Sequence, residues 1–252
     1  MKCNYSFKHY LEILQLIKKQ GYNSIKVSET VKKQEGKIIV LRHDVDTSPK
    51  NALKTAVMEH KEGIISSYYV LLHSKLYNAL SPDNIKIIKQ IRDLGHEIGL
   101  HYDTSVFHKE NILSGVINDI KILELAINTT VKSVSQHNPS TSMLVKELGK
   151  HVIDSYNDNL INGSYKYFSD SGYQWRHGCI CKFLGKFDKL HILIHPNSWS
   201  LGGGGYKDVL QNNLKEITRD IKEEIEETIK FTTEYLKKRE KLDKIRENCY
   251  KK

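Results

Sequence analysis

Cysteine is scarce in this sequence: its 252 residues include four, at Cys3, Cys179, Cys181 and Cys249. Four scattered cysteines are too few for a disulfide scaffold. One residue separates Cys179 from Cys181, where a zinc knuckle or redox motif has two, and no second pair completes the set. The scarcity excludes a disulfide-rich secreted fold and predicts a protein of a reducing compartment.

Long apolar runs are also lacking. No stretch approaches the roughly 18 consecutive apolar residues of a membrane-spanning helix. The sequence starts MKCNYSFKHYLEIL, with Lys, Asn and His where a signal peptide needs an apolar core. These absences predict a cytoplasmic protein without a membrane span.

Negative charge is the scarcer sign. Lysine and arginine number 39 against 30 acidic residues, a net charge of +9, and residues 237–252 alone contribute +5 of it. The remainder is close to balanced, so we expect no nucleic-acid partner. The alternative, nucleic-acid binding by the basic C-terminal tail, predicts a salt-dependent affinity for oligonucleotides that is lost when residues 237–252 are deleted.

Strand and helix patterns alternate along the chain. Short apolar runs predict strands at 37–46, 65–72, 96–102, 131–137 and 190–199, and helical spacing predicts helices at 48–63, 81–95 and 111–127. An earlier amphipathic helix runs from Phe7 to Ile17, and 201–205 is expected to be a loop. The alternation predicts a mainly parallel sheet or barrel with helices outside, and places the chemistry at the carboxyl ends of the strands.

A single helical pattern occupies residues 214–252, with apolar residues three and four apart and charges between them. We expect this helix to pack on the body with its last turns in solvent; a coiled coil that makes the chain a homo-oligomer is the alternative. The expected division is a helical segment at 1–36, the β/α body at 37–213 and the long helix at 214–252.

Ionisable side chains follow several of these strands. Asp44 and Asp46, two apart on a strand, lie on the same side of it, and such close like charges need a compensating cation or proton. His101, His137 and His195 stand at other strand ends. Carboxylate and imidazole groups that converge in this way suit a divalent metal, zinc first, and a carboxylate left off the metal can act as a general base.

The neighbours of these residues have simpler expected roles. Arg42 shares a face with Asp44 and Asp46, where it can neutralise them. His43 alternates with Asp44, so it is expected to face the helices as a core histidine. His96, at the start of its strand, is expected to be a buried structural imidazole.

Five short motifs follow one another along residues 37–200: RHDVD (42–46), GHEIGLH (95–101), HNPS (137–140), YFSDSGYQWR (167–176) and LHILIHP (190–196). Together they resemble the five motifs of the polysaccharide deacetylase superfamily, carbohydrate esterase family four. The likeness is greatest to the deacetylase-like branch of bacterial surface-polysaccharide (O-antigen) gene clusters.

The resemblance implies a distorted (β/α)7 barrel and metal-dependent removal of an N-acetyl group from a sugar. Asp44 matches the general base and His195 the general acid. Asp46 and His101 match metal ligands, while His137 stands where the family often has an arginine that contacts the base. Asp170, Trp175 and Arg176, in the segment that closes the sugar groove, are expected to bind substrate. Apart from the resemblance, Trp199 follows the HPNS turn, where it can serve as a platform that stacks on a sugar; packing at the rim is the alternative.

One departure concerns the metal. The family usually has a second ligand histidine four residues after the first, and here that position is Ser105. His137, Asp103 and His108 are candidate substitutes, of which we favour His137. The resemblance therefore predicts a cytoplasmic carbohydrate N-deacetylase of surface-polysaccharide (lipopolysaccharide) biosynthesis that uses a divalent metal. The alternative is a non-catalytic sugar-binding or scaffold protein without a competent metal site.

Overall fold

The structure, a computed structural model, describes residues 4–139, 145–200 and 202–250. The chain divides into two compact units, Met1–Val209 and Leu210–Lys252. In chain order, the α-helices and strands of the described residues are α1 (Phe7–Lys19), β1 (Asn23–Ser24), β2 (Ile38–Val45), α2 (Pro49–Lys61), β3 (Ser67–Leu71), α3 (Pro82–Asp93), β4 (Glu97–Tyr102), α4 (Ile112–Ile127), β5 (Ser133–Gln136), β6 (Ile153–Asp154), α5 (Asp158–Ile161), β7 (Lys166–Ser169), β8 (Lys189–Ile194) and α6 (Tyr206–Tyr250).

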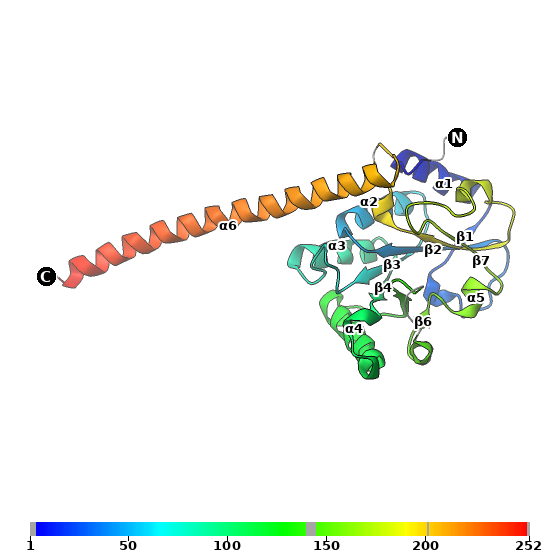
Figure 1. The fold of residues 1–252 in the computed structure, drawn as a ribbon, viewed down its shortest axis with the longest axis horizontal. Helices are drawn as coiled ribbons and strands as arrows, with labels where there is room; N and C mark the ends of the chain where they lie inside the picture. The colour runs from blue at the N-terminus through cyan, green and yellow to red at the C-terminus, as the bar shows by residue number, and fades with distance from the viewer. Residues whose placement is uncertain (1–3, 140–144, 201, 251–252) are drawn as a thin grey trace. The chain divides into compact units, whose positions relative to one another are not determined.

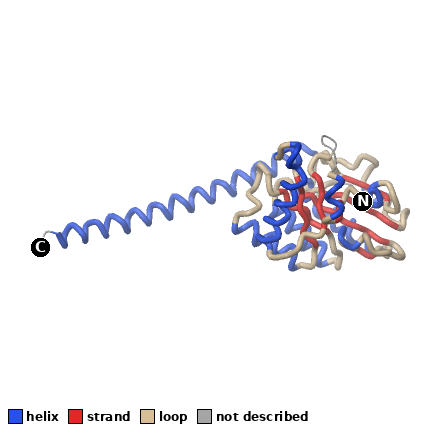
Figure 2. The backbone as a smooth tube through the Cα atoms, turned by 90° about the horizontal axis from the view of Figure 1, so that it is seen from below, coloured by secondary structure: helices blue, strands red, loops and turns tan. Residues whose placement is uncertain are grey.

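The first unit is built on one parallel sheet (Figure 1). Its strands follow the order β6-β5-β4-β3-β2-β8-β7, and β1 pairs with β2 off this path. Figure 2 shows the strands gathered inside this unit with helices and loops around them. The predicted distorted (β/α)7 barrel is thus confirmed as a curled parallel sheet of seven strands with flanking helices.

Strand β2 lies inside the sheet, between β3 and β8, and all eight of its residues are buried. Leu41 belongs to a core cluster with the apolar face of α1, whereas Val40 packs with Val27 and Tyr69 in a different cluster. Neighbouring residues of a strand point to opposite faces. His43 therefore faces the helices, as predicted, and Asp44 faces the interior of the curled sheet.

The helices on the outer face begin where their sequences predict. Ser48 caps α2 by accepting a hydrogen bond from the backbone N–H of Asn51, and Pro49 occupies the first turn. Ser81 caps α3 in the same way, through the N–H of Asn84. The chain can therefore cross from one parallel strand to the next in a short helix.

Some boundaries differ from the predictions. The strand expected at 190–199 ends at Ile194, because Pro196 starts a 3-10 turn that runs to Ser198. The short strands β1, β6 and β7 were not predicted, since two to four residues carry no alternating pattern long enough to read. The last helix begins at Tyr206 rather than at 214; Leu201, in the predicted loop, lies outside the described residues.

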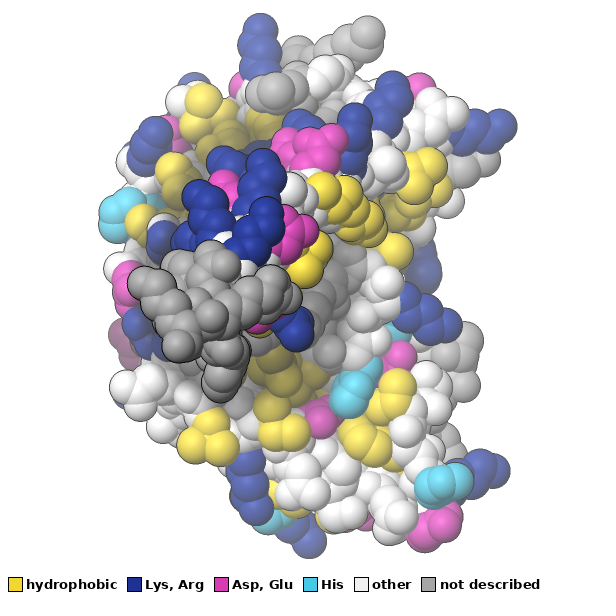
Figure 3. All heavy atoms as spheres, turned by 90° about the vertical axis from the view of Figure 1, so that its left-hand side faces the viewer, with side chains coloured by type: hydrophobic (Ala, Val, Ile, Leu, Met, Phe, Trp, Pro, Cys, Tyr) yellow, Lys and Arg dark blue, Asp and Glu magenta, His cyan; other side chains and the backbone are white. Residues whose placement is uncertain are grey.

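In the second unit, α6 carries exposed apolar side chains among charges. Those exposed by 49 to 72% include Leu214, Ile221, Ile225, Ile229, Phe231, Tyr235, Leu236 and Leu242. Ion pairs one turn apart, such as Arg219 with Glu223, run along the helix. Figure 3 shows Lys and Arg side chains next to acidic side chains. Packing and self-association of α6 stay predictions.

None of the described helices is both long enough and apolar enough to cross a lipid bilayer.

Candidate metal centre and active site

Ionisable side chains meet at the carboxyl edge of the sheet. Asp46 directly follows β2, His101 lies near the end of β4, His137 directly follows β5, and His195 directly follows β8. Carboxyl ends of parallel strands meet at one edge, so residues far apart in the sequence become neighbours. All four line a single cavity of about 450 Å³.

Asp46, His101 and His137 form a compact group within this cavity. One ligand atom from each lies within 4.8 Å of the other two. His101 Nε2 is 3.3 Å from Asp46 Oδ1 and 3.2 Å from His137 Nδ1, which is itself 3.8 Å from Asp46 Oδ1. The structure therefore brings together the three residues that the sequence predicted as ligands.

The hydrogen bonds around this group leave lone pairs pointing inward. His101 Nδ1 is 2.9 Å from the carbonyl oxygen of Ser135 and donates to it, which leaves Nε2 as an acceptor. Asp46 Oδ1 is buried and has no hydrogen-bond partner among the described residues. Asn138 Nδ2 lies 2.9 Å from His137 Nε2 and can donate a hydrogen bond to it, which orients the ring. One carboxylate and two imidazoles of this kind fit a divalent cation such as zinc.

The other substitutes considered for Ser105 do not join the group. Asp103 accepts a hydrogen bond from the backbone N–H of Ser105 at 2.9 Å, and His108 is exposed. Of the three, His137 alone lies within ligand distance of Asp46 and His101 in the described part of the chain.

Charges around the group shift its pKa values. Burial alone would raise the pKa of Asp46, but His101 and His195 outweigh it and hold that pKa below its ordinary value. Burial alone would lower the pKa of His101, but Asp44 and Asp46 raise it. Burial and the neighbouring His101 lower the pKa of His137.

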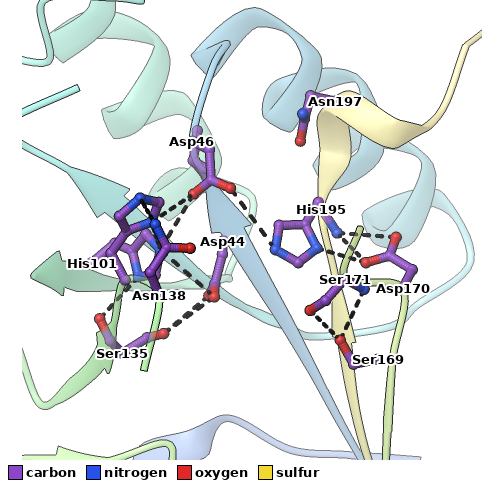
Figure 4. Close-up of polar contacts among 12 residues, drawn as sticks. Asp44, Asp46, His101, Ser135, Asn138, Ser169, Asp170, Ser171, His195 and Asn197 are labelled. Atoms are coloured by element: carbon purple, nitrogen blue, oxygen red, sulfur yellow. Dashed lines mark hydrogen bonds and ion pairs between the residues drawn. The ribbon is translucent and has the colours of Figure 1, made fainter. Parts of the chain in front are cut away.

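Figure 4 shows Asp44 beneath Asp46, and Asp44 is almost fully buried. Arg42 donates to both of its carboxylate oxygens, from Nε at 3.0 Å and from Nη2 at 2.7 Å, and Ser135 Oγ donates at 3.2 Å. Burial alone would raise the pKa of Asp44, but Arg42 and His101 hold it well below its ordinary value. Arg42 thus neutralises Asp44, and neither of these two carboxylate contacts is with Asp46.

His195 is held in place by Asp170. Its Nδ1 lies 2.6 Å from Asp170 Oδ1, and its backbone N–H donates to the same carboxylate at 3.0 Å. Burial alone would lower the pKa of His195, but Asp170 outweighs it and raises that pKa to about 9. Figure 4 shows Asp46 between the His101 side of the site and His195, whose Nε2 is 3.8 Å from Asp46 Oδ2.

Two of the predicted substrate-binding residues do not line the cavity. Asp170 is fully buried behind His195, so its carboxylate positions the imidazole and cannot reach a substrate. Trp199 is 1% exposed and donates from Nε1 to Asp170 Oδ2 at 3.3 Å, so its ring packs in the core. Both follow residues that do line the cavity, and a sequence pattern does not record which side chains face it.

Trp175 and Arg176 line the cavity, as expected of groove residues. Three tyrosines that the sequence did not single out as site residues line it as well: Tyr156, Tyr167 and Tyr173. The Tyr156 ring stacks under the Arg42 guanidinium at 4.1 Å. Tyr173 lies within the YFSDSGYQWR motif, which was the available signal, whereas Tyr156 stands in no recognisable pattern.

No protein-family model matches this chain, and no curated protein matches it either. Among solved structures, it is similar to the Xyl-CE4 domain of a multidomain xylanase from the hindgut metagenome of Trinervitermes trinervoides. The identity is 12% and the TM-score 0.44, over 75% of this chain and 85% of the other. It is also similar to the chitin deacetylase of Colletotrichum lindemuthianum (14% identity, TM-score 0.46, 77% and 86% covered). A third similar structure is a CE4 family pseudoenzyme from Bacillus anthracis, with 14% identity and a TM-score of 0.47 over 75% of this chain and 63% of the other. Function is therefore inferred from the side chains of the cavity.

Proposed function

We propose that this protein is a metal-dependent hydrolase that removes an N-acetyl group from a sugar. The observation that carries this proposal is the convergence of two different groups on one cavity. Asp46, His101 and His137 form a ligand set on one side, and the His195–Asp170 pair faces it from the other. The order of the five motifs, which resembles that of polysaccharide deacetylases, supports the same reaction.

Asp46, His101 and His137 would hold the metal. A divalent cation such as zinc, when bound, supplies Lewis-acid polarisation of the acetamide carbonyl and eases the deprotonation of water. The hydrogen bond from His101 Nδ1 to Ser135 keeps that ring oriented and its Nε2 available.

Asp44 is proposed as the general base. Its Oδ2 lies 3.8 Å from His101 Nε2, next to the ligand set, so it can accept a proton from a water attacking the carbonyl. Arg42 and Ser135 fix the carboxylate in one orientation. Because Arg42 also makes Asp44 a weak base, proton transfer depends on a water that is already acidified.

His195 is proposed as the general acid. Asp170 orients its ring and keeps the imidazole protonated near neutral pH, so Nε2–H is available to the departing amine. Proton donation turns that amine into a good leaving group when the C–N bond breaks.

A carbohydrate is the proposed substrate. The wall formed by Tyr173 and Trp175 offers aromatic surface for the apolar face of a sugar ring, and Arg176 offers a charge for a carboxylate or phosphate on the substrate. From the motif resemblance, we propose a nucleotide-linked or lipid-linked intermediate of bacterial surface-polysaccharide biosynthesis.

The test is acetate release by the zinc-loaded full chain from N-acetylated sugars and their nucleotide conjugates. We expect Asp44→Asn to abolish turnover while zinc affinity changes only a few-fold. Circular dichroism checks that this variant folds, because it leaves the buried Arg42 without its charge partner. A near-normal rate for Asp44→Asn would overturn the role of Asp44.

A second candidate is a non-catalytic sugar-binding protein. It is favoured by Ser105, an exposed residue at the position of an expected ligand, and by the full pairing of Asp44 with Arg42. This candidate predicts saturable binding of a glycan by the zinc-treated protein with no acetate released, whereas the hydrolase releases acetate.

A further inference from the structure

A second group of metal-binding side chains lies outside the cavity. His9 from α1 meets Cys179 and Cys181, and their ligand atoms lie within 4.8 Å of one another. His9 and Cys179 are buried and Cys181 is partly so. None of the three lines the cavity of the proposed active site.

His9 is oriented as a ligand histidine would be. Its Nε2 lies 3.2 Å from Cys179 Sγ, while its Nδ1 lies 3.0 Å from Glu12 Oε2. With a proton on Nδ1 donated to Glu12, Nε2 is left with a lone pair that points at the thiol. Metal-ligating histidines generally donate their second ring nitrogen to a carboxylate or carbonyl in this manner.

We propose that His9, Cys179 and Cys181 bind a zinc ion. In a tetrahedral zinc site the nitrogen and sulfur ligands stand about 3.5 Å apart, close to the His9–Cys179 separation of 3.2 Å. Two thiolates cancel the charge of Zn²⁺, so a neutral unit is placed in a largely buried position. Soft thiolates select zinc over magnesium or calcium, and a solvent molecule can complete the coordination.

The Cys-x-Cys spacing alone does not indicate this site. The third ligand is 170 residues away in the sequence, and only the packing of α1 brings it to the thiols. The spacing argues against a zinc knuckle, but it does not reveal a site that two distant segments share.

The zinc would fasten one wall of the cavity to α1. Trp175, Arg176 and Gly178 line the cavity directly before Cys179, and the short helix Ile180–Lys182 follows. The His9 ring also stacks with Trp199, whose Nε1–H donates a hydrogen bond to Asp170. The ion would therefore stiffen the groove segment without touching the substrate.

Cobalt(II) titration of the metal-stripped, reduced full chain tests this site, because thiolate ligands give cobalt an intense near-ultraviolet charge-transfer band. We expect one thiolate-bound cobalt per chain. The band should persist in Asp46→Ala/His101→Ala, which separates this site from the proposed active site. It should also persist in Cys249→Ser, which removes a thiol that is not part of the proposed ligand set.

The ligand variants complete the test. Cys181→Ser, at a partly exposed position, should weaken cobalt binding at least tenfold, and Cys179→Ser/Cys181→Ser should abolish the band. Glu12→Gln should lower the affinity about 10- to 100-fold, as loss of an outer-shell partner does. Three outcomes would overturn the proposal: no band in the wild type, a band that survives in the double serine variant, or an air-formed disulfide between these thiols that added zinc does not prevent.

Discussion

Two carboxylate clusters lie on opposite faces of β2. His43 points toward the helices, where it meets Glu59, and the next residue, Asp44, points toward the cavity. On the helix side, Glu59 of α2 accepts hydrogen bonds from Tyr68 Oη at 2.6 Å, from His43 Nε2 at 2.7 Å and from Tyr10 Oη. On the cavity side, Asp44 is paired with Arg42, and Asp46 faces two histidines without a hydrogen bond to Oδ1 among the described residues.

The difference lies in the donors. The carboxylate of Glu59 is surrounded by phenol and imidazole protons, which satisfy both of its oxygens and leave no room for a cation. The Asp46 carboxylate instead faces His101 and His137, with Oδ1 free of a hydrogen bond among the described residues. A buried carboxylate with enough donors is structural, whereas Asp46, beside two imidazoles, is the proposed cation ligand.

The largest expected effect is a loss of kcat, and it comes from a change on the cavity side of β2. His195→Gln should lower kcat about 10²- to 10⁴-fold, because it removes the proposed general acid. Steady-state acetate release measures this loss of kcat. His43→Gln, on the helix side of β2, is the matched control. If the folded His43→Gln enzyme lost as much kcat as His195→Gln, the division between the two faces would fail.

Disrupting the Glu59 cluster, on the helix side of β2, should lower the stability of the fold instead of kcat. Glu59→Ala leaves His43 and two tyrosine hydroxyls buried without their acceptor, which should lower the free energy of unfolding by about 3–5 kcal/mol. Urea unfolding measures this change, and zinc binding at the cavity of the folded variant should be unchanged. A loss below about 1 kcal/mol would mean that this cluster is not structural.

The pH dependence of stability sharpens the same point. Burial alone would raise the pKa of Glu59, but His43 and His96 outweigh it and lower that pKa to about 2, from an ordinary 4.5. A depressed carboxyl pKa stabilises the fold above the unfolded-state pKa, and this stabilisation is lost as the pH falls from about 4.5 to about 2.

The free energy of unfolding of the wild type should therefore exceed that of Glu59→Gln by less and less as the pH falls through this range. Urea unfolding should show this difference shrink by about 2–3 kcal/mol. A difference that stays constant with pH would show that Glu59 is not ionised in the folded protein.

The smallest effects come from two hydroxyls. On the cavity side, Ser135 Oγ contacts Asp44 and Arg42. On the helix side, Thr55 Oγ1 lies 3.1 Å from Tyr68 Oη. Ser135→Ala and Thr55→Val should each lower the free energy of unfolding by about 1 kcal/mol, and Ser135→Ala alone should lower kcat. Equal kcat values for both variants would contradict this contrast.

Sequence reasoning predicted the positions that alternate along strands. It placed Asp44 and His43 on opposite faces of β2 and His96 in the core, where His96 Nε2 lies 3.0 Å from the carbonyl oxygen of Ala56. These follow from the period of two along a strand, which does not depend on partners.

What the sequence could not predict depends on contacts between distant segments. Asp170 and Trp199 were expected at the substrate, but Asp170, directly after β7, hydrogen-bonds His195, and Trp199, in the turn after β8, hydrogen-bonds Asp170. His9 and the two cysteines meet only because α1 packs beside the segment that follows β7. Such contacts arise from tertiary packing, for which a single sequence carries no local signal.

The most direct test of the account is zinc content by elemental analysis in a Cys179→Ser/Cys181→Ser background, which removes the second proposed site. We predict one zinc per chain, lost when Asp46→Ala and His101→Ala are added. Equal zinc content with and without those two substitutions would contradict the claim that the Asp46, His101 and His137 group is a metal centre.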